Sequence, residues 1–258
     1  IIAMGLFFIL SKFKAEKILR TWFFIVIIIA LGISINSFLN VQYSAYIALG
    51  IALVLAFYKV FKRDILIHNL TELLIYAGIA AVFVPIKGFS LTVLIVVLLL
   101  ISIYDMWAVW SSGVMQKMAH YQIESVKVFP GFFIPYLSEN MKKKYKKLKA
   151  KSKELKKKNK ELTKKEKESI KANVAMLGGG DIVFATIAAG IMLKTYGYMN
   201  ISGIIVPLGS LMSILGATLG LSYLFLLSEK KKFYPAMPFI TIGILLGIGA
   251  FKLITLFI

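Results

Sequence analysis

The chain has 258 residues, of which 59% are hydrophobic, and it carries a formal net charge of +19 at pH 7. A mean hydropathy of +0.82 is too high for an ordinary soluble domain and excludes catalysis on a large, loop-built soluble fold. The absence of cysteine excludes thiol nucleophiles, disulfides and thiolate metal sites. The charge is a local property of one loop, because 16 of the 31 Lys and Arg residues lie between Lys142 and Lys171.

Continuous apolar runs divide the chain into candidate membrane-spanning helices. The first run, residues 1–10, is about half the length that a bilayer requires, so we expect this helix to be incomplete and natural N-terminal sequence to be missing. Complete runs follow at residues 21–39, 41–60, 65–87, 90–110, 174–193, 201–227 and 234–257. The sequence therefore predicts an all-α polytopic membrane protein with seven full spans and one truncated N-terminal span.

The runs group into three predicted regions: N-terminal membrane helices at residues 1–110, a polar loop at 111–172 and C-terminal membrane helices at 173–258. If successive runs alternate in direction, 28 of the 31 Lys and Arg residues, Lys59 among them, lie on one side of the membrane. The other side holds Lys87, Lys194 and Lys252. Because Lys and Arg collect in cytoplasmic loops, we predict a multi-pass protein of the cell membrane with the 111–172 loop in the cytoplasm.

The predicted loop has two parts of different character. Residues 113–138 are amphipathic, and the segment VFPGFFIP (residues 128–135) is expected to be a short extended piece at the membrane interface. Residues 141–171 are rich in Lys and Glu, with leucines at heptad spacing. They favour a solvated helix or helical hairpin, and disorder remains an alternative. We expect anionic lipid headgroups to be the counter-ions of this segment and expect no nucleic-acid partner.

Two acids interrupt the apolar runs. Asp105 lies near the end of LTVLIVVLLLISIYDMWAVW, and Asp181 follows three glycines at the start of another run. An ionised carboxylate in hydrocarbon is costly, so such residues mark functional sites and usually have a partner. The predicted topology places both acids roughly 8 to 12 Å below the cytoplasmic face, on antiparallel helices. They are therefore expected to meet at one level.

Two carboxylates held close together cannot both ionise easily, so such a pair tends to share one proton. This arrangement suits aspartyl proteolysis, in which the ionised acid takes a proton from water and the protonated acid donates one to the peptide carbonyl. A proton or cation relay in a transporter is equally compatible with the acids alone.

Two further features favour the protease. The glycines at 178–180 lower helix stability and allow another backbone to approach Asp181, whereas small-residue packing would explain only one or two of them. Residues 235–238, Pro-Ala-Met-Pro, begin the last run. Prolines are ordinary in the first turn of a helix, but an irregular backbone at this point could also line a cavity.

The chain thus carries Tyr104-Asp105, Gly178-Gly179-Gly180-Asp181 and Pro235-Ala236-Met237, in that order, on three of the predicted helices. These motifs resemble the YD, GxGD and PAL motifs of the presenilin and signal peptide peptidase family of intramembrane aspartyl proteases. The order of the motifs, the long loop between the acids and the predicted orientation agree with that family over essentially the whole chain.

The resemblance implies that Asp105 and Asp181 are the catalytic pair. It further implies that the other motif residues border the substrate site, namely Tyr104, Gly178, Gly179, Gly180, Pro235, Ala236 and Met237. The segment VFPGFFIP and the residues before Gly178 would offer edges for a substrate strand. The implied substrates are transmembrane-helix peptides in the lipid bilayer. No metal or other cofactor is implied, accessory subunits are not required, and an oligomer is possible.

Two departures from the family pattern stand out. Met237 replaces the usual leucine, which is a volume-conserving change. The family has nine spans with YD on the sixth, whereas Asp105 lies on the fifth apolar run here. The first span and part of the second would therefore be absent. The small chain resembles archaeal homologues of the family more than the animal enzymes.

Other groups of residues are weaker candidates for a functional site. Asp64, His68 and Glu72 have a spacing that suits metal ligands, but we expect them to pack or hydrogen-bond between helices at a membrane boundary. The chain has neither a zinc-binding His-Glu-x-x-His nor a Gly-x-Ser-x-Gly elbow, and we expect His120 to be an interfacial surface residue. A prepilin-type peptidase also uses a GxGD acid but lacks the proline motif. A transporter is expected to show related halves, and no internal repeat is visible.

Overall fold

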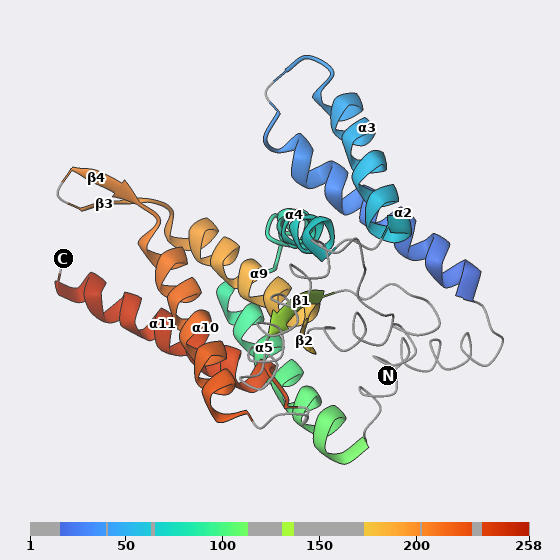
Figure 1. Cartoon of the computed structure of the whole chain (residues 1–258). Coiled ribbons are helices and arrows are strands. Elements are labelled where there is room, and N and C mark those ends of the chain that lie inside the picture. The colour runs from blue at the N-terminus through green and yellow to red at the C-terminus, as the bar shows by residue number, and fades with distance from the viewer. Residues whose placement is uncertain are drawn as a thin grey trace, which may run out of the picture. The chain divides into compact units, whose positions relative to one another are not determined.

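The computed structural model describes residues 16–39, 41–62, 65–112, 131–136, 173–201, 203–228 and 234–257. Within these ranges a helix lies at each of the seven positions expected from the apolar runs (Figure 1). They are α2 (Glu16–Asn36), α3 (Ser44–Phe57), α4 (Ile65–Phe83), α5 (Leu91–Trp107), α9 (Gly179–Tyr196), α10 (Leu208–Leu227) and α11 (Met237–Phe257). Two π-helical turns extend α3 and α5, namely η1 (Tyr58–Lys62) and η2 (Ala108–Ser112).

Two of the predicted runs begin with strands instead of helix. Strand β2 (Asn173–Gly178) precedes α9 and pairs with β1 (Gly131–Tyr136), so the extended conformation expected within VFPGFFIP is confirmed for its described part. Strands β3 (Met199–Ile201) and β4 (Ile204–Val206) form an antiparallel hairpin before α10. The predicted helix starts at residues 174 and 201 are therefore wrong. An apolar run without a clear hydrophobic period does not distinguish a helix from a strand. Glycines lie at the end of β2 and in the turn between β3 and β4, where regular structure is interrupted.

The described residues divide into two compact units. The first contains all seven described helices and the β3–β4 hairpin, so helices from before and after the polar loop pack into one body. The second contains β1 and β2 as far as Leu177.

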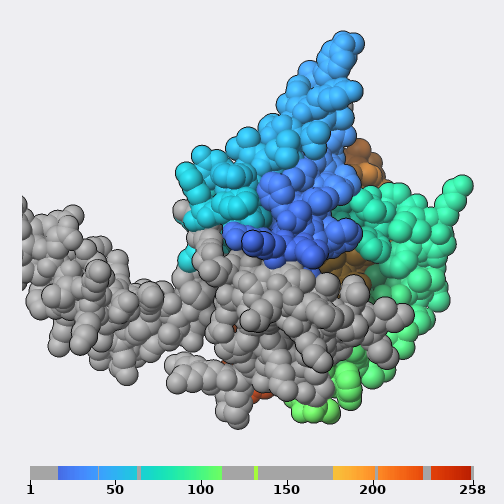
Figure 2. Space-filling model, turned by 90° about the vertical axis from the view of Figure 1, so that its right-hand side faces the viewer, coloured from blue at the N-terminus to red at the C-terminus, as the bar shows by residue number. Residues whose placement is uncertain are grey.

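Six of the described helices are long and apolar enough to cross a membrane: α2, α3 with η1, α4, α5 with η2, α10 and α11. Helix α9 is not in this set; its 18 residues include Asp181 and Lys194. Large apolar side chains such as Trp22, Ile29 and Val54 are exposed on α2 and α3. These two helices, in blue, form much of the coloured part of the face in Figure 2. Exposed apolar helix faces suit contact with lipid. The chain is a multi-pass α-helical membrane protein.

Glycines allow α10 and α11 to pack with their backbones in contact. A Cβ atom added to Gly216 would overlap the carbonyl oxygen of Gly243, and one added to Gly243 would overlap that of Gly216. Gly220 and Gly247 make equally close approaches to the opposite helix. Small residues at this spacing are the usual means by which membrane helices approach closely, since lipid offers no hydrophobic driving force. The pair fixes the position of α11, whose first residues enter the candidate site.

Candidate active site

Asp105 is buried in α5 and is bound by the beginning of α11. Its carboxylate oxygen Oδ2 accepts a hydrogen bond from the backbone N–H of Met237 at 3.1 Å, and only 5% of the residue is exposed. Met237 is the first residue of α11, and the carbonyl of Ala236 before it accepts the first helical hydrogen bond, from the N–H of Ile240. The first N–H groups of a helix have no partner within the helix and carry partial positive charge. The start of α11 therefore offers a natural site for a carboxylate.

A second polar contact sets the register between α5 and α11. The hydroxyl oxygens of Ser102 and Thr241 lie 2.8 Å apart, and both residues are buried. Ser102 precedes Asp105 by about one turn, and Thr241 follows Met237 by about one turn, so the two helices are antiparallel. The Ser102–Thr241 contact thus helps to hold Asp105 opposite the N-terminus of α11.

Asp181 lies in the first turn of α9. Gly178 has an extended backbone (φ −61°, ψ 137°) and precedes the helix, which begins at Gly179. The sequence predicted a helix from about residue 174 with its acid some eight residues inside. That expectation is wrong, because the residues before Gly179 form strand β2. The chain rises about 3.3 Å per residue in a strand and 1.5 Å per residue in a helix, so a depth counted along a helix does not apply to them. Asp181 instead lies among the free N–H groups at the start of α9, where negative charge is favourable.

The Asp181 carboxyl lies close to Gly178, the residue that precedes α9. A Cβ atom added to Gly178 would lie 3.1 Å from Asp181 Oδ2, which is tighter than an ordinary contact. Gly179 is buried, whereas a Cβ atom at Gly180 would meet no described residue within 4 Å. A side chain at position 178 would therefore disturb the acid directly, and one at position 180 would meet none of the described part of the chain.

Three mutually contacting helices bring the predicted motifs together. Helices α5, α9 and α11 each pack against the other two. Phe184 of α9 packs against the same buried cluster that contains Ala236 and Met237. The carboxyl groups of Asp105 and Asp181 are close enough for their charges to interact. That they form a catalytic pair stays a prediction.

The remaining motif residues differ in exposure. Pro235 and Ala236 are buried at the start of α11. Tyr104 is 43% exposed, and its ring centroid lies 6.1 Å from that of Trp107. Neighbouring residues in a helix point about 100° apart, so Tyr104 leaves α5 in a different direction from the buried Asp105. Its role in substrate binding stays a prediction.

His68 and Glu72 belong to a buried polar cluster that links α4 to η1. The amine of Lys59 forms an ion pair with Glu72, donates to Thr71 Oγ1 at 3.3 Å and lies 3.4 Å from His68 Nδ1. The hydrogen bonding between helices that the sequence predicted for His68 and Glu72 is therefore confirmed. Within the described ranges no group of three or more His, Cys, Asp or Glu side chains could hold a metal ion, and Asp64 and His120 lie outside those ranges.

The structure adds the surroundings of Lys59. The sequence counted this residue with the charges on one side of the membrane, which stays a prediction, and the structure shows it within η1 and only 5% exposed. Sequence reasoning also missed Tyr76, which is 4% exposed on α4. One signal was present, since Glu72 is a carboxylate in an apolar helix and such a group needs a partner.

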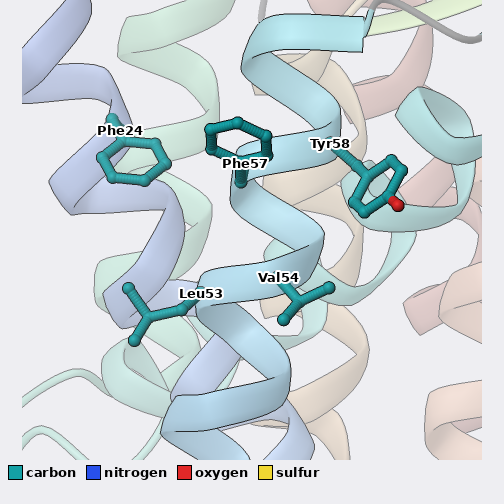
Figure 3. Close-up of a pocket in the computed structure, with 5 residues that line it drawn as sticks. All are labelled: Phe24, Leu53, Val54, Phe57 and Tyr58. Carbon is teal, nitrogen blue, oxygen red and sulfur yellow. The ribbon is translucent and has the colours of Figure 1, made fainter.

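A separate groove lies on α2 and α3 (Figure 3). It has a volume of about 380 Å³ and is lined by Phe24, Leu53, Val54, Phe57 and Tyr58. Of the described residues that line it, Tyr58 alone has an ionisable side chain. These residues offer contact area for an apolar group.

The contact between Met237 and Asp105 predicts an unusual mutational pattern. Met237→Leu is expected to change activity less than about three-fold, because the volume is similar and the backbone N–H is kept. Met237→Pro removes the N–H and is expected to lower kcat at least ten-fold, although proline is compatible with the first position of a helix. Rates of substrate cleavage and melting temperatures of both variants test this. A fully active Met237→Pro variant would show that the hydrogen bond has no role.

Residues 2–255 match the family described as signal-peptide peptidase, presenilin aspartyl protease. A search of curated proteins found no match. The family match spans nearly the whole chain, including all three motifs that surround Asp105. The chain belongs to the signal-peptide peptidase and presenilin family of aspartyl proteases.

Proposed function

We propose that the protein is an intramembrane aspartyl endopeptidase that uses Asp105 and Asp181 to hydrolyse peptide bonds within transmembrane segments. Membership of an aspartyl protease family supports a peptidase. The observation that carries the assignment of residues is the buried carboxylate of Asp105, which accepts from the N–H of Met237 and interacts with the charge of Asp181. Asp105 thus contacts the N-terminus of α11, Asp181 lies in the first turn of α9, and these two helices and α5 pack against one another.

In the proposed reaction the two carboxyl groups hold one proton between them. The ionised carboxylate takes a proton from a water molecule, whose oxygen bonds to the peptide carbonyl carbon, while the protonated carboxyl donates to the carbonyl oxygen. The resulting gem-diol collapses as its hydroxyl proton returns to one carboxylate and the other carboxyl protonates the leaving nitrogen, so the C–N bond breaks. The N–H of Met237 donates to Oδ2 of Asp105 and so helps to hold this carboxyl in place during the reaction.

We infer that substrate enters sideways from the bilayer as a transmembrane segment. A helical peptide has its carbonyl groups in hydrogen bonds, so the segment must unwind before water can attack. Gly180 supports access of an extended backbone to Asp181, because a Cβ atom there would meet no described residue within 4 Å. The concentration of Lys and Arg in the 111–172 loop supports a position in the cell membrane with this loop and the acids toward the cytoplasm.

Reconstitution into liposomes with a single-span reporter substrate tests the proposal. We expect mass spectrometry to find cleavage within the apolar segment of the reporter, in its cytoplasmic third. EDTA is expected to leave the rate unchanged, because neither acid requires a metal in this mechanism. Proton-coupled flux of a solute without any cleavage would instead support a transporter, and cleavage only at the membrane boundary would support a prepilin-type peptidase.

A further inference from the structure

Two buried hydroxyl groups lie between α5 and α11, one turn away from the contact between Asp105 and Met237. The oxygens of Ser102 and Thr241 are 2.8 Å apart, and the two residues are 6% and 2% exposed. Both hydroxyls also lie near the carbonyl of Leu98, which accepts from Ser102 at 2.7 Å and from Thr241 at 3.5 Å. The three groups form a buried polar network that spans the two helices.

Stability alone is a weak reason for this network. A serine hydroxyl can bond to a carbonyl one turn back in its own helix, as Ser102 does with Leu98, so it needs no second helix. Hydrogen bonds between membrane helices add little stability on average, because separated helices find other partners. A hydrogen bond is nonetheless directional, whereas apolar packing is not. The contact can therefore fix where α11 lies along α5.

The two polar contacts between α5 and α11 together define one register. They lie about 4.5 Å apart along α5, from Ser102 to Asp105, and about 6 Å apart along α11, from Met237 to Thr241. The N–H of Met237 donates to Asp105 Oδ2 at 3.1 Å, and a shift of α11 by about 1 Å would take these atoms out of hydrogen-bond range. The close glycine contacts join α11 to α10 and not to α5. The hydroxyl contact therefore limits movement that would separate the N–H from the carboxylate.

We propose that Ser102 and Thr241 are positioning residues for Asp105, and that they act by holding the N–H of Met237 at its carboxylate. Neither hydroxyl touches the substrate in this role. A reacting group that is displaced by about 1 Å can lose about 10²-fold in rate, so a contact of modest strength can have a large kinetic effect. This inference rests on the proposed protease function and deepens it, since it adds two residues outside the three motifs.

The first test removes only the hydroxyl of Thr241. Thr241→Val keeps the branched shape of the side chain and is expected to lower kcat for reporter cleavage about ten-fold. KM is expected to stay within about two-fold of the wild-type value, and Tm within about 3 °C, because the hydrogen bond contributes little stability. A Thr241→Val variant with wild-type kcat would overturn the positioning role.

Two further variants separate positioning from packing. Thr241→Ser keeps the hydroxyl and is expected to retain kcat within about two-fold, although it leaves a gap that valine would fill. If Thr241 only packed against α5, Thr241→Ser would instead be the more damaged variant. Thr255→Val on the same helix removes a hydroxyl that bonds to the Lys252 carbonyl of α11 itself at 2.9 Å, and it is expected to leave kcat unchanged.

The second test asks whether the hydroxyls act through the N–H of Met237. Because Met237→Pro removes that N–H, adding Thr241→Val to it is expected to lower kcat by less than about two-fold more. Ser102→Ala combined with Thr241→Val is likewise expected to cost no more than Thr241→Val alone, because both changes remove the same contact. This second pair does not depend on the folding of a proline variant. Losses that multiply in either pair would overturn the inference.

These outcomes can be told apart from failure of the protease proposal itself. If Asp105→Asn remains active in a folded protein, the proposed function is wrong whatever Thr241 does. If Asp105→Asn is inactive and Thr241→Val has the wild-type kcat, the function stands and the inference about the hydroxyl pair fails.

Discussion

Replacing either Asp105 or Asp181 by asparagine is expected to lower kcat for reporter cleavage by roughly 10³-fold or more, which is the usual cost of removing one member of a catalytic group. Asparagine keeps the volume of aspartate but can neither take the proton from water nor donate one to the peptide. In Asp105→Asn the amide oxygen still accepts from the N–H of Met237, so α5 and α11 should keep their contact. The melting temperature of each variant is therefore expected to stay near that of the wild-type protein.

The control for these variants is Asp64→Asn. Asp64 is the remaining aspartate of the chain, and the same chemical change there is expected to leave cleavage unaffected. If Asp105→Asn or Asp181→Asn retains more than a few per cent of the wild-type rate in a folded protein, the aspartyl mechanism must be abandoned.

The second large effect is expected at the contact between α10 and α11. In Gly243→Leu the new side chain would overlap the backbone of α10 at Gly216 and force the helices apart. We expect a loss of about 3 kcal/mol, which lowers Tm by about 6 to 12 °C in a chain of this size. Because α11 carries the N–H that binds Asp105, activity is expected to fall with stability.

Gly249→Leu is the matched control on the same helix. A Cβ atom at Gly249 would meet none of the described residues within 4 Å, so the same increase in side-chain volume is expected to change Tm by less than about 2 °C. Equal thermal unfolding curves for Gly243→Leu and the wild-type protein would contradict the close packing of α10 on α11.

The sequence predicted the helices well because lipid imposes a simple rule. A segment that crosses the bilayer must satisfy its backbone within the helix and present apolar side chains, so continuous apolar runs identify it. The same rule made Asp105 and Asp181 visible, since an acid within such a run is costly. The sequence did not reveal that α9 begins only two residues before Asp181, because apolar residues of β2 lengthen the run toward its N-terminus.

The contacts around the acids could not be predicted for a different reason. The N–H of Met237 is a backbone group, which any residue other than proline would supply, so its hydrogen bond to Asp105 leaves no mark on the sequence. The burial of the Lys59 amine was not expected either, because a lysine at the end of an apolar run normally reaches water. Only the packing of η1 against α4 shows that its amine turns inward to Glu72.

The central claim is that the carboxyl groups of Asp105 and Asp181 face one another, and cross-linking tests it most directly because the chain has no native cysteine. In the variant Asp105→Cys with Asp181→Cys, we expect oxidation or a thiol cross-linker with a spacer of about 5 Å to join α5 to α9. Ser102→Cys with Thr241→Cys is the positive control, and Asp105→Cys with Lys194→Cys is the negative control. Failure of the first pair to link with any spacer shorter than about 10 Å, while the positive control links, would contradict the account.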